Sequence, residues 1–259
     1  MDCAGVANYL AGWIRDQVSS AGAQGVVVGI SGGIDSAVVT GLSGRAVPGR
    51  VLGLLLPAHS NPQDMDDAKA VAQTFGVPTK VIDLAPLFDL AVESFDPGAA
   101  RESSKGGTPE HYSGLLSVAV ANLKPRLRMI ALYYFANKLN YIVAGTGNRS
   151  EIEIGYFTKY GDGGVDILPI GALVKTQVWE LARFLGVPEK VISRTPTAGL
   201  WQGQTDEGEM GIAYRDLDRF ILTGQASPEV RERIASMHAR SEHKRRCPPV
   251  AQVAPELLA

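Results

Sequence analysis

The sequence contains few of the residues that mark several common protein classes. Only two of its 259 residues are cysteines, Cys3 and Cys247, and no CxxC pair occurs. Two such distant cysteines predict free thiols in a reducing compartment, not a metal knuckle or a redox pair. No apolar run reaches the roughly 18 residues that cross a bilayer, and acidic residues interrupt the segment where a signal peptide would lie. We therefore expect a cytoplasmic protein with no membrane partner.

An excess of positive charge is also absent. The chain has 25 Lys and Arg residues against 27 Asp and Glu, which gives a net charge of −2 at pH 7. Proteins that bind nucleic acid broadly present a basic face, so no nucleic-acid partner is expected. The hydrophobic content of 45% allows a full core, and the length suits one α/β domain over residues 1–259.

The apolar pattern predicts strands that alternate with helices. Buried strands are expected at 25–30, 51–56, 79–84 and 141–144, and helices at 4–20, 36–44, 62–75, 85–95 and 113–139. Pro125 lies inside the last helix and should kink or split it. This alternation predicts a doubly wound, mainly parallel sheet flanked by helices, with ligands at the carboxyl ends of the strands. The loops at 31–36, 57–60 and 145–151 should then share one rim.

Two further segments are candidate lids. Residues 96–112 show no apolar period, and their length suits either a functional lid or a disordered surface insertion. Residues 195–206 carry Trp201 between Gly199 and Gly203, which suits a hinged flap with an aromatic cover. Simple packing is the alternative for Trp201.

The turn after the first strand is the most informative segment. A β-branched run from Val26 to Ile30 stops at Ser31-Gly-Gly33, and a helix begins around Asp35-Ser36. A helix N-terminus offers unpaired N–H groups and a partial positive charge. The glycines let the backbone approach a ligand, and the serines add hydroxyl donors. The expected ligand is a phosphate or a pyrophosphate.

Neither of two common phosphate motifs occurs at this turn. No Gly-Lys-Ser/Thr follows the glycines, and the G-x-G-x-x-G spacing is missing. Asp35 is unexpected because a carboxylate repels phosphate. It either supplies favourable charge at the helix N-terminus or holds Mg²⁺ against the phosphates, and the surrounding serines and glycines favour Mg²⁺.

The segment Ser31-Gly-Gly-Ile-Asp-Ser36 resembles the pyrophosphate loop of the ATP pyrophosphatases, the PP-loop superfamily. These enzymes cleave ATP between the α- and β-phosphates and adenylate a substrate oxygen. The six residues do not distinguish the members of the superfamily. Later segments do so: 122–129 (NLKPRLRM), 145–151 (GTGNRSE), 155–164 (GYFTKYGDGG), 173–178 (LVKTQV), 196–198 (PTA), 203–207 (GQTDE) and 243–244 (HK).

Each of these segments alone has an ordinary interpretation. Arg126 and Arg128 suit a solvated helix face, Lys175 suits a surface, and 243–246 suits a solvated terminal cluster. Their order and spacing together resemble the ammonia-dependent NAD synthetase family over residues 5–250. The departures are Pro125, where the family more often has alanine, and Arg149, where lysine is common.

The resemblance implies ATP-dependent amidation of deamido-NAD by ammonia, through an NAD-adenylate, with release of AMP and pyrophosphate. This reaction is the last step of NAD biosynthesis, and the family is homodimeric. ATP is assigned to Gly29, Ile30, Ser31, Gly32, Gly33, Ile34, Asp35, Ser36, Thr146, Lys175 and Thr197. Mg²⁺ is assigned to Asp35 and Glu151, and deamido-NAD to Arg126, Lys159, Asp166, His243 and Lys244. Ammonium must lose a proton, for which Asp162 or Asp166 is the candidate acceptor.

Two alternatives stay open. Another adenylating amidotransferase or tRNA-modifying member of the superfamily would carry an RNA-binding region or cysteine chemistry. A non-catalytic adenine-nucleotide sensor would keep the phosphate loop and could lose the metal-binding acids. One helix precedes the first strand, so no separate glutaminase domain is expected, and the nitrogen source is free ammonia or ammonia from another subunit.

Overall fold

Four parallel strands form one sheet in the order β3-β2-β1-β4. The computed structural model describes residues 1–97, 115–201, 203–254 and 257–258, so the candidate lid at 96–112 lies almost entirely outside the described residues. The strands are β1 (Gly25–Gly29), β2 (Val51–Leu55), β3 (Thr79–Val81) and β4 (Tyr141–Ala144). The predicted parallel sheet is confirmed, although β3 ends three residues early. Its residues are exposed at the sheet edge, where short strands are common.

The central strand aligns the ends of its neighbours. Val27 pairs with Leu52 of β2 and with Val143 of β4, so the three strands finish at nearly the same level. The loops that follow them therefore emerge at one rim, as the sequence predicts. This rim is where ligands bind in open parallel sheets.

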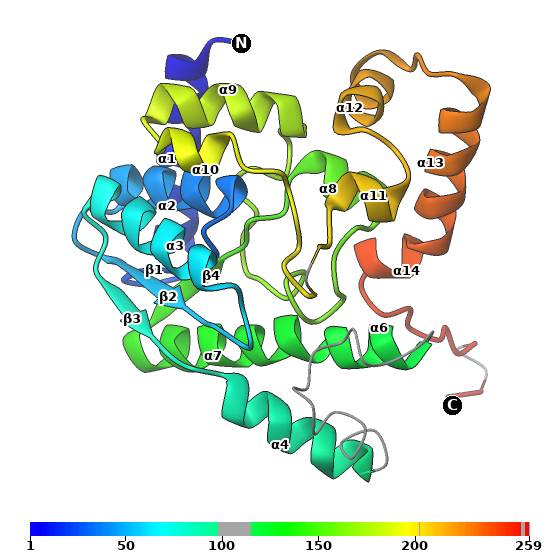
Figure 1. The fold of residues 1–259 in the computed structure, drawn as a ribbon, viewed down its shortest axis with the longest axis horizontal. Helices are drawn as coiled ribbons and strands as arrows, with labels where there is room; N and C mark the ends of the chain where they lie inside the picture. Colours follow the sequence, from blue (N-terminus) through cyan, green and yellow to red (C-terminus); the bar gives the residue numbers. More distant parts are fainter. Residues whose placement is uncertain (98–114, 202, 255–256, 259) are drawn as a thin grey trace.

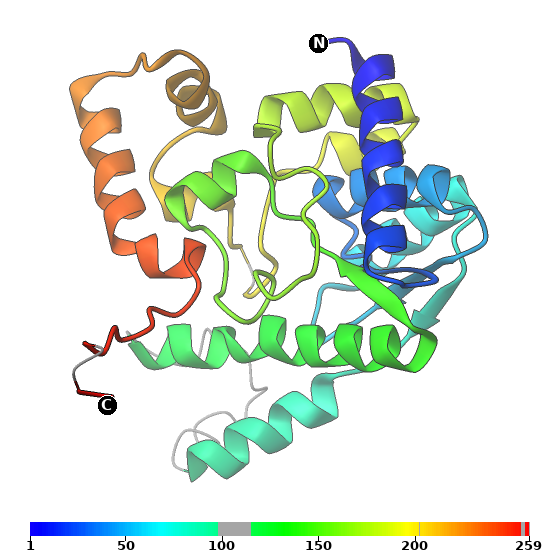
Figure 2. The ribbon, with the colours of Figure 1, turned by 180° about the vertical axis from the view of Figure 1, so that it is seen from behind.

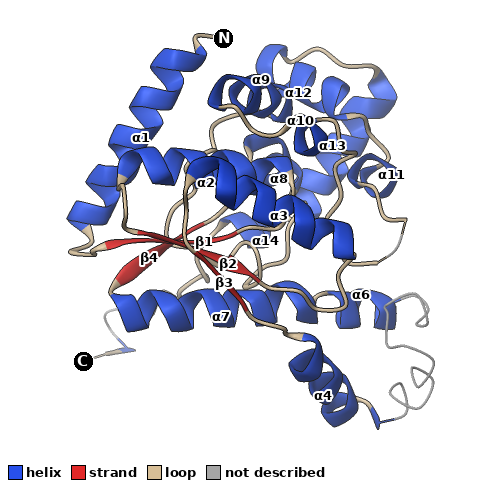
Figure 3. Ribbon diagram, turned by 60° about the vertical axis from the view of Figure 1, so that its left-hand side comes forward, coloured by secondary structure: helices blue, strands red, loops and turns tan. Residues whose placement is uncertain are grey.

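Alternate valines of β1 pack on opposite faces of the sheet. Val26 and Val28 join the core formed with α1 (Cys3–Ser20), α2 (Ile34–Ala46) and α3 (Pro62–Phe75). Val27 joins the core that includes Ala136 of α7 (Leu123–Leu139). All three valines are fully buried, which explains why the strand is continuously apolar. Figure 3 shows the sheet between these two layers of helices.

Pro125 divides the long helix predicted over 113–139. The chain forms α6 (Leu115–Ala121) and then α7, and the break falls at Asn122. A proline ring clashes with the carbonyl group four residues earlier, which here belongs to Ala121. Pro125 itself lies in the first turn of α7, where a missing N–H costs little. Beneath α7 lies α4 (Ala85–Phe95), which packs through Phe88 (Figure 1).

The remaining helices fall into two groups. The helices α9 (Lys175–Leu185) and α10 (Glu189–Ile192) pack in the same core as α1, α2 and α3. The others are α8 (Arg149–Ile154), α11 (Asp206–Met210), α12 (Tyr214–Thr223), α13 (Pro228–Arg240) and α14 (Glu242–Arg245). A separate core around Tyr214, Met210 and Ile234 holds α8 and α11–α13 together. Figure 2 shows this group from behind, beside the sheet. Within the described residues, no helix has the length and apolar character needed to cross a membrane.

Candidate functional site

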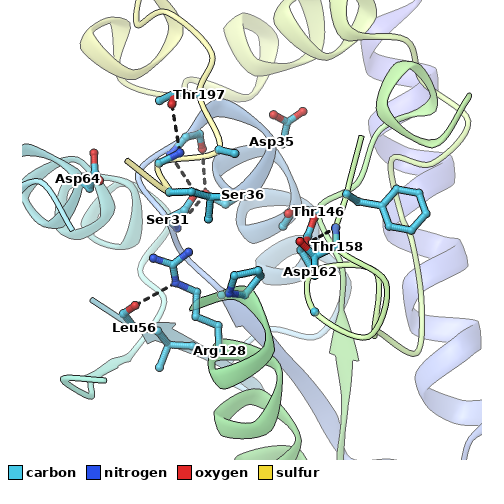
Figure 4. Close-up of a pocket in the computed structure, with 18 of the residues that line it drawn as sticks. Ser31, Asp35, Ser36, Leu56, Asp64, Arg128, Thr146, Thr158, Asp162 and Thr197 are labelled. Carbon is cyan, nitrogen blue, oxygen red and sulfur yellow. Dashed lines mark hydrogen bonds between the residues drawn. The ribbon is translucent and has the colours of Figure 1, made fainter. Parts of the chain in front are cut away.

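A cavity of about 540 Å³ opens at the carboxyl ends of the strands (Figure 4). Most residues that the sequence assigns to ATP line it, although they come from two strand ends and two later segments. They are Gly29, Ile30, Ser31, Gly33, Ile34, Asp35, Ser36, Thr146, Lys175 and Thr197. The fold therefore brings these scattered candidates to one place.

The turn between β1 and α2 curls around the hydroxyl group of Ser36. That oxygen accepts hydrogen bonds from the Ser31 backbone N–H (3.2 Å) and lies 3.1 Å from Ser31 Oγ. It donates to the Gly33 carbonyl oxygen at 2.8 Å. Gly33 is the N-cap of α2 and has no side chain to satisfy the first amides of the helix. The turn thus directs helix N–H groups and two hydroxyls at the cavity, which suits an anion.

Gly32 is the one predicted ATP residue that does not line the cavity. Its φ of +83° lies in the left-handed region, and a Cβ there would stand 2.5 Å from the Asp64 carbonyl oxygen. A side chain at this position would therefore push against the backbone of α3. Glycine is needed here so that α3 can pack directly against the turn of residues 31–36, here called the phosphate turn.

Lys175 connects the two carboxylates that the resemblance assigns to a metal. Its buried Nζ forms an ion pair with Asp35 and lies 3.6 Å from Glu151 Oε1. Asn148 holds both acids in place, because its side chain donates to Asp35 Oδ1 (3.0 Å) and accepts from the Glu151 N–H (3.1 Å). Asn148 is the N-cap of α8 and Lys175 begins α9, so side chains from the starts of two helices contact Asp35.

Burial and mutual repulsion shift the proton affinities in this cluster. Desolvation and the nearby charge of Asp35 raise the pKa of Glu151 to about 8. Burial alone would lower the pKa of Lys175, but the carboxylates of Asp35 and Glu151 outweigh it and raise that pKa. Asp206 is also buried beside this cluster, and desolvation raises its pKa while the Tyr214 hydroxyl donates to it at 2.9 Å.

The chemistry of this cluster fits a hard divalent cation. With Asp206 included, three carboxylates face one ammonium, a net charge of −2 when all are ionised. No set of three or more His, Cys, Asp or Glu side chains among the described residues is placed to enclose a metal. Mg²⁺ commonly takes one or two carboxylates and completes its shell with phosphate oxygens and water. Asp35 and Glu151 are two carboxylates of that kind beside the cavity.

The opposite wall of the cavity carries Arg128 and Asp162 (Figure 4), and Lys244 also lines the cavity. Arg128 reaches from α7 and donates to the Leu56 carbonyl oxygen and the Ser60 hydroxyl, each at 3.2 Å. Desolvation lowers its pKa, yet the guanidinium remains charged because its ordinary pKa is so high. It is a cation directed at the phosphate turn from across the cavity.

Asp162 faces the cavity from the turn after α8. It accepts a hydrogen bond from the Thr158 N–H at 2.9 Å, and the protein around it raises its pKa by desolvation. Lys244 lies close by and donates to the carbonyl oxygens of Gly155 (2.8 Å) and Phe157 (2.6 Å). Its ammonium therefore ties α14 to this turn while it also lines the cavity.

Four residues assigned to deamido-NAD lie outside the cavity lining. Arg126 and His243 are exposed. Lys159 donates to the His243 carbonyl oxygen at 2.5 Å. Asp166 accepts hydrogen bonds from the Tyr133 hydroxyl (2.9 Å) and the Val143 N–H (2.8 Å). The structure thus places Lys244 and Asp162 in the cavity but not these four.

Sequence reasoning missed Arg128, Asp206 and Tyr214. The first two lie in segments that stood out in the sequence, 122–129 and 203–207. Residues two apart on a helix do not share a face, so only one of Arg126 and Arg128 could face the site. Knowing which side of α7 packs on the sheet would have identified Arg128 as the arginine that faces the cavity. Nothing in the sequence points to Tyr214, which meets Asp206 only through the tertiary packing of α11 and α12.

The sequence and the fold were compared with those of known proteins, and both comparisons match the same family. A sequence model of the NAD synthase family matches residues 6–248. The NH(3)-dependent NAD(+) synthetase of Carboxydothermus hydrogenoformans is 49% identical over 241 residues, which cover 93% of this chain and 94% of that protein. Two solved structures share the fold over their full length. An NMN synthetase from Francisella tularensis has a TM-score of 0.87 at 37% identity, covering 98% of this chain and all of that one. An NH3-dependent NAD synthetase from Campylobacter jejuni has a TM-score of 0.76 at 28% identity, covering 97% of this chain and all of that one.

Proposed function

The chain belongs to the NAD synthase family, and we propose that it catalyses the ATP-dependent amidation of deamido-NAD by ammonia. The products are NAD, AMP and pyrophosphate. One observation carries the proposal: the phosphate turn, the Asp35–Glu151–Lys175 cluster and the wall with Arg128 and Asp162 all line a single cavity. ATP on the turn would therefore present its α-phosphate to a second substrate that enters against the opposite wall.

In the first step a carboxylate oxygen of the nicotinate ring attacks the α-phosphorus of ATP. The bond to the β-phosphate breaks, and pyrophosphate leaves with its negative charge. The N–H groups of the turn, the hydroxyls of Ser31 and Ser36, and the cations Lys175 and Arg128 stabilise that charge. These groups position the substrates and neutralise the developing negative charge, so the step needs no nucleophile from the protein.

Asp35 and Glu151 would hold Mg²⁺ in this proposal. A bound Mg²⁺ supplies charge neutralisation between the phosphates and the two acids. Asn148 keeps both carboxylates oriented, and Lys175 balances part of their charge.

In the second step ammonia attacks the acyl carbon, AMP leaves, and the new amide nitrogen loses a proton to solvent. The ammonia is formed when ammonium loses a proton in the cavity. Asp162 is the proposed acceptor of that proton, because it faces the cavity and its raised pKa makes it a better base than an ordinary aspartate. If Asp162→Asn keeps the full rate at saturating ammonium, this assignment is wrong.

The remaining contacts to deamido-NAD are proposed from the resemblance. Arg126, Lys159, Asp166 and His243 lie outside the cavity lining, so we propose that they meet the part of the dinucleotide that extends beyond it. A homodimer, in which a second copy covers this part, and a cytoplasmic location belong to the same proposal.

A second candidate substrate follows from the comparison with the Francisella tularensis protein, which is named for NMN synthesis. The same chemistry on nicotinate mononucleotide would yield NMN. The reacting carboxylate is identical in the two substrates, so the cavity described above serves both. Only contacts to the added adenylyl half distinguish them.

The test is a product assay with purified protein, ATP and Mg²⁺. Deamido-NAD and nicotinate mononucleotide are supplied in separate reactions, each with ammonium chloride or with glutamine. We expect NAD and AMP from deamido-NAD with ammonium alone. Product from glutamine would show a glutaminase activity, and a kcat/KM that favours the mononucleotide would make NMN synthesis the main function. Absence of AMP in all reactions would refute amidation through an adenylate.

A further inference from the structure

One buried cation of this fold has no part in the chemistry described above. Lys124 lies on the first turn of α7 and is 1% exposed. Its Nζ donates to the Leu200 carbonyl oxygen at 2.9 Å and lies 5.5 Å from the centre of the Phe88 ring. Phe88 belongs to α4, and Leu200 belongs to a segment that lines the cavity. Lys124 therefore connects α7 and α4 to the segment that contains Leu200.

The segment from Thr195 to Leu200, here called the strap, forms one border of the cavity, and all its residues line it. Figure 4 shows Thr197 next to the phosphate turn. The strap contains no regular secondary structure, so its position depends on contacts with other elements. At its start, the side chain of Arg194 pairs with Asp64 and Asp67 of α3.

At the far end of the strap, the backbone of Leu200 is held at both its polar groups. Lys124 binds the carbonyl oxygen, and the Leu200 N–H donates to Gln204 Oε1 at 2.9 Å. Gln204 donates in turn to Glu209 Oε2 at 2.7 Å, and that oxygen also accepts from the Tyr156 hydroxyl at 2.8 Å. These bonds connect the strap to α7, α11 and the end of α8.

Burial of an ammonium group is costly, so its presence needs a compensating role. An apolar side chain of similar length would pack against Phe88 without that cost. It could not bind a carbonyl oxygen, and the end of the strap would lose its contact with α7. The hydrogen bond from Lys124 to the Leu200 carbonyl oxygen offsets part of that cost and fixes the Leu200 peptide against α7.

We propose that Lys124 is a positioning residue which, together with Gln204, clamps Leu200 so that the strap stays closed over the reacting adenylate. This inference rests on the proposed function. An acyl-adenylate is open to water, which attacks the acyl carbon, releases AMP and regenerates the carboxylate, so that ATP is spent without amide. A clamped strap excludes that water and leaves ammonia as the nucleophile.

The test measures AMP and amide product together in Lys124→Met, at low and at high ammonium. We expect the AMP that is not matched by amide to rise about tenfold, because loss of a hydrogen bond from a charged donor shifts an open–closed equilibrium by at least that factor. High ammonium should suppress this excess AMP, because ammonia and water compete for the same intermediate. Lys124→Arg, which keeps a charged donor, should restore the coupling.

Lys138→Met is the matched control, since Lys138 is an exposed lysine on the same helix. It should keep the wild-type ratio of AMP to amide. A Lys124→Met protein that is slower but retains that ratio would overturn the proposal. If Lys124→Met does not fold, Gln204→Leu releases the same peptide from its other side, and an unchanged ratio there would likewise refute the clamp. Wild-type protein that makes no amide would refute the proposed function itself.

Discussion

Gly32 offers the sharpest test of how the phosphate turn is built. Replacing it by alanine adds a single methyl group to a residue with φ of +83°. The new Cβ would stand 2.5 Å from the Asp64 carbonyl oxygen, 3.2 Å from Asp67 Cβ and 3.3 Å from the Ala68 nitrogen. Two of these three atoms are backbone atoms of α3, so no side-chain rotation can relieve the contact.

The expected loss of stability has two parts. A left-handed conformation costs alanine about 1 kcal/mol more than glycine. Overpacking against a rigid neighbour adds roughly 1–3 kcal/mol. Gly49→Ala separates the two parts, because Gly49 has φ of +74° and an alanine Cβ there would have no neighbouring atom within 4 Å. We expect Gly49→Ala to lose about 1 kcal/mol and Gly32→Ala to lose about 3 kcal/mol.

Urea unfolding monitored by circular dichroism measures both losses, and the amide assay measures the consequence for the site. Movement of the turn away from α3 displaces the phosphate-binding N–H groups, so kcat/KM for ATP should fall by roughly 10²-fold in Gly32→Ala. It should stay near the wild-type value in Gly49→Ala. Equal stability losses in the two variants, or full activity of Gly32→Ala, would refute the close packing of α3 on the turn.

Three further predictions follow from single side chains. Ser43 has a buried hydroxyl without a hydrogen-bond partner among the described residues, so Ser43→Ala should raise the free energy of unfolding by about 1 kcal/mol, and a loss would contradict this. Arg128→Met should raise KM for ATP by roughly 10-fold or more, while Arg126→Met should leave it unchanged; the reverse result would mean that Arg126 is the phosphate contact. Burial acts to raise the pKa of Asp67, but hydrogen bonds from Lys190 and Gln63 and the charge of Arg194 outweigh it and lower that pKa. A lowered pKa stabilises the fold above the unfolded-state pKa, so Asp67→Asn should cost about 2 kcal/mol at pH 7, and this deficit should shrink as pH falls below about 4; a deficit independent of pH would refute the role of charge.

Local patterns in the sequence were sufficient for most elements of the fold. The run of valines specified β1, Asn61-Pro62 specified the start of α3, and Pro125 specified a break in the helix before α7. Each signal acts over a few residues, through burial on both faces of a strand, through a cap, or through a steric clash with the preceding turn. The phosphate turn is equally local, because a strand, two glycines and a helix start are contiguous in the chain.

The tertiary structure alone decided which charges face one another. Asp35, Glu151 and Lys175 are far apart in the sequence, and they meet because parallel strands end at one rim and two helices begin there. The same packing places Arg128 in the cavity lining and leaves Arg126 exposed. Which of the two arginines faces the cavity depends on which side of α7 covers the sheet. It also brought Lys124 to Leu200, 76 positions later in the chain. Such contacts depend on how whole elements pack, so residue types and short spacings identify the candidates but not their partners.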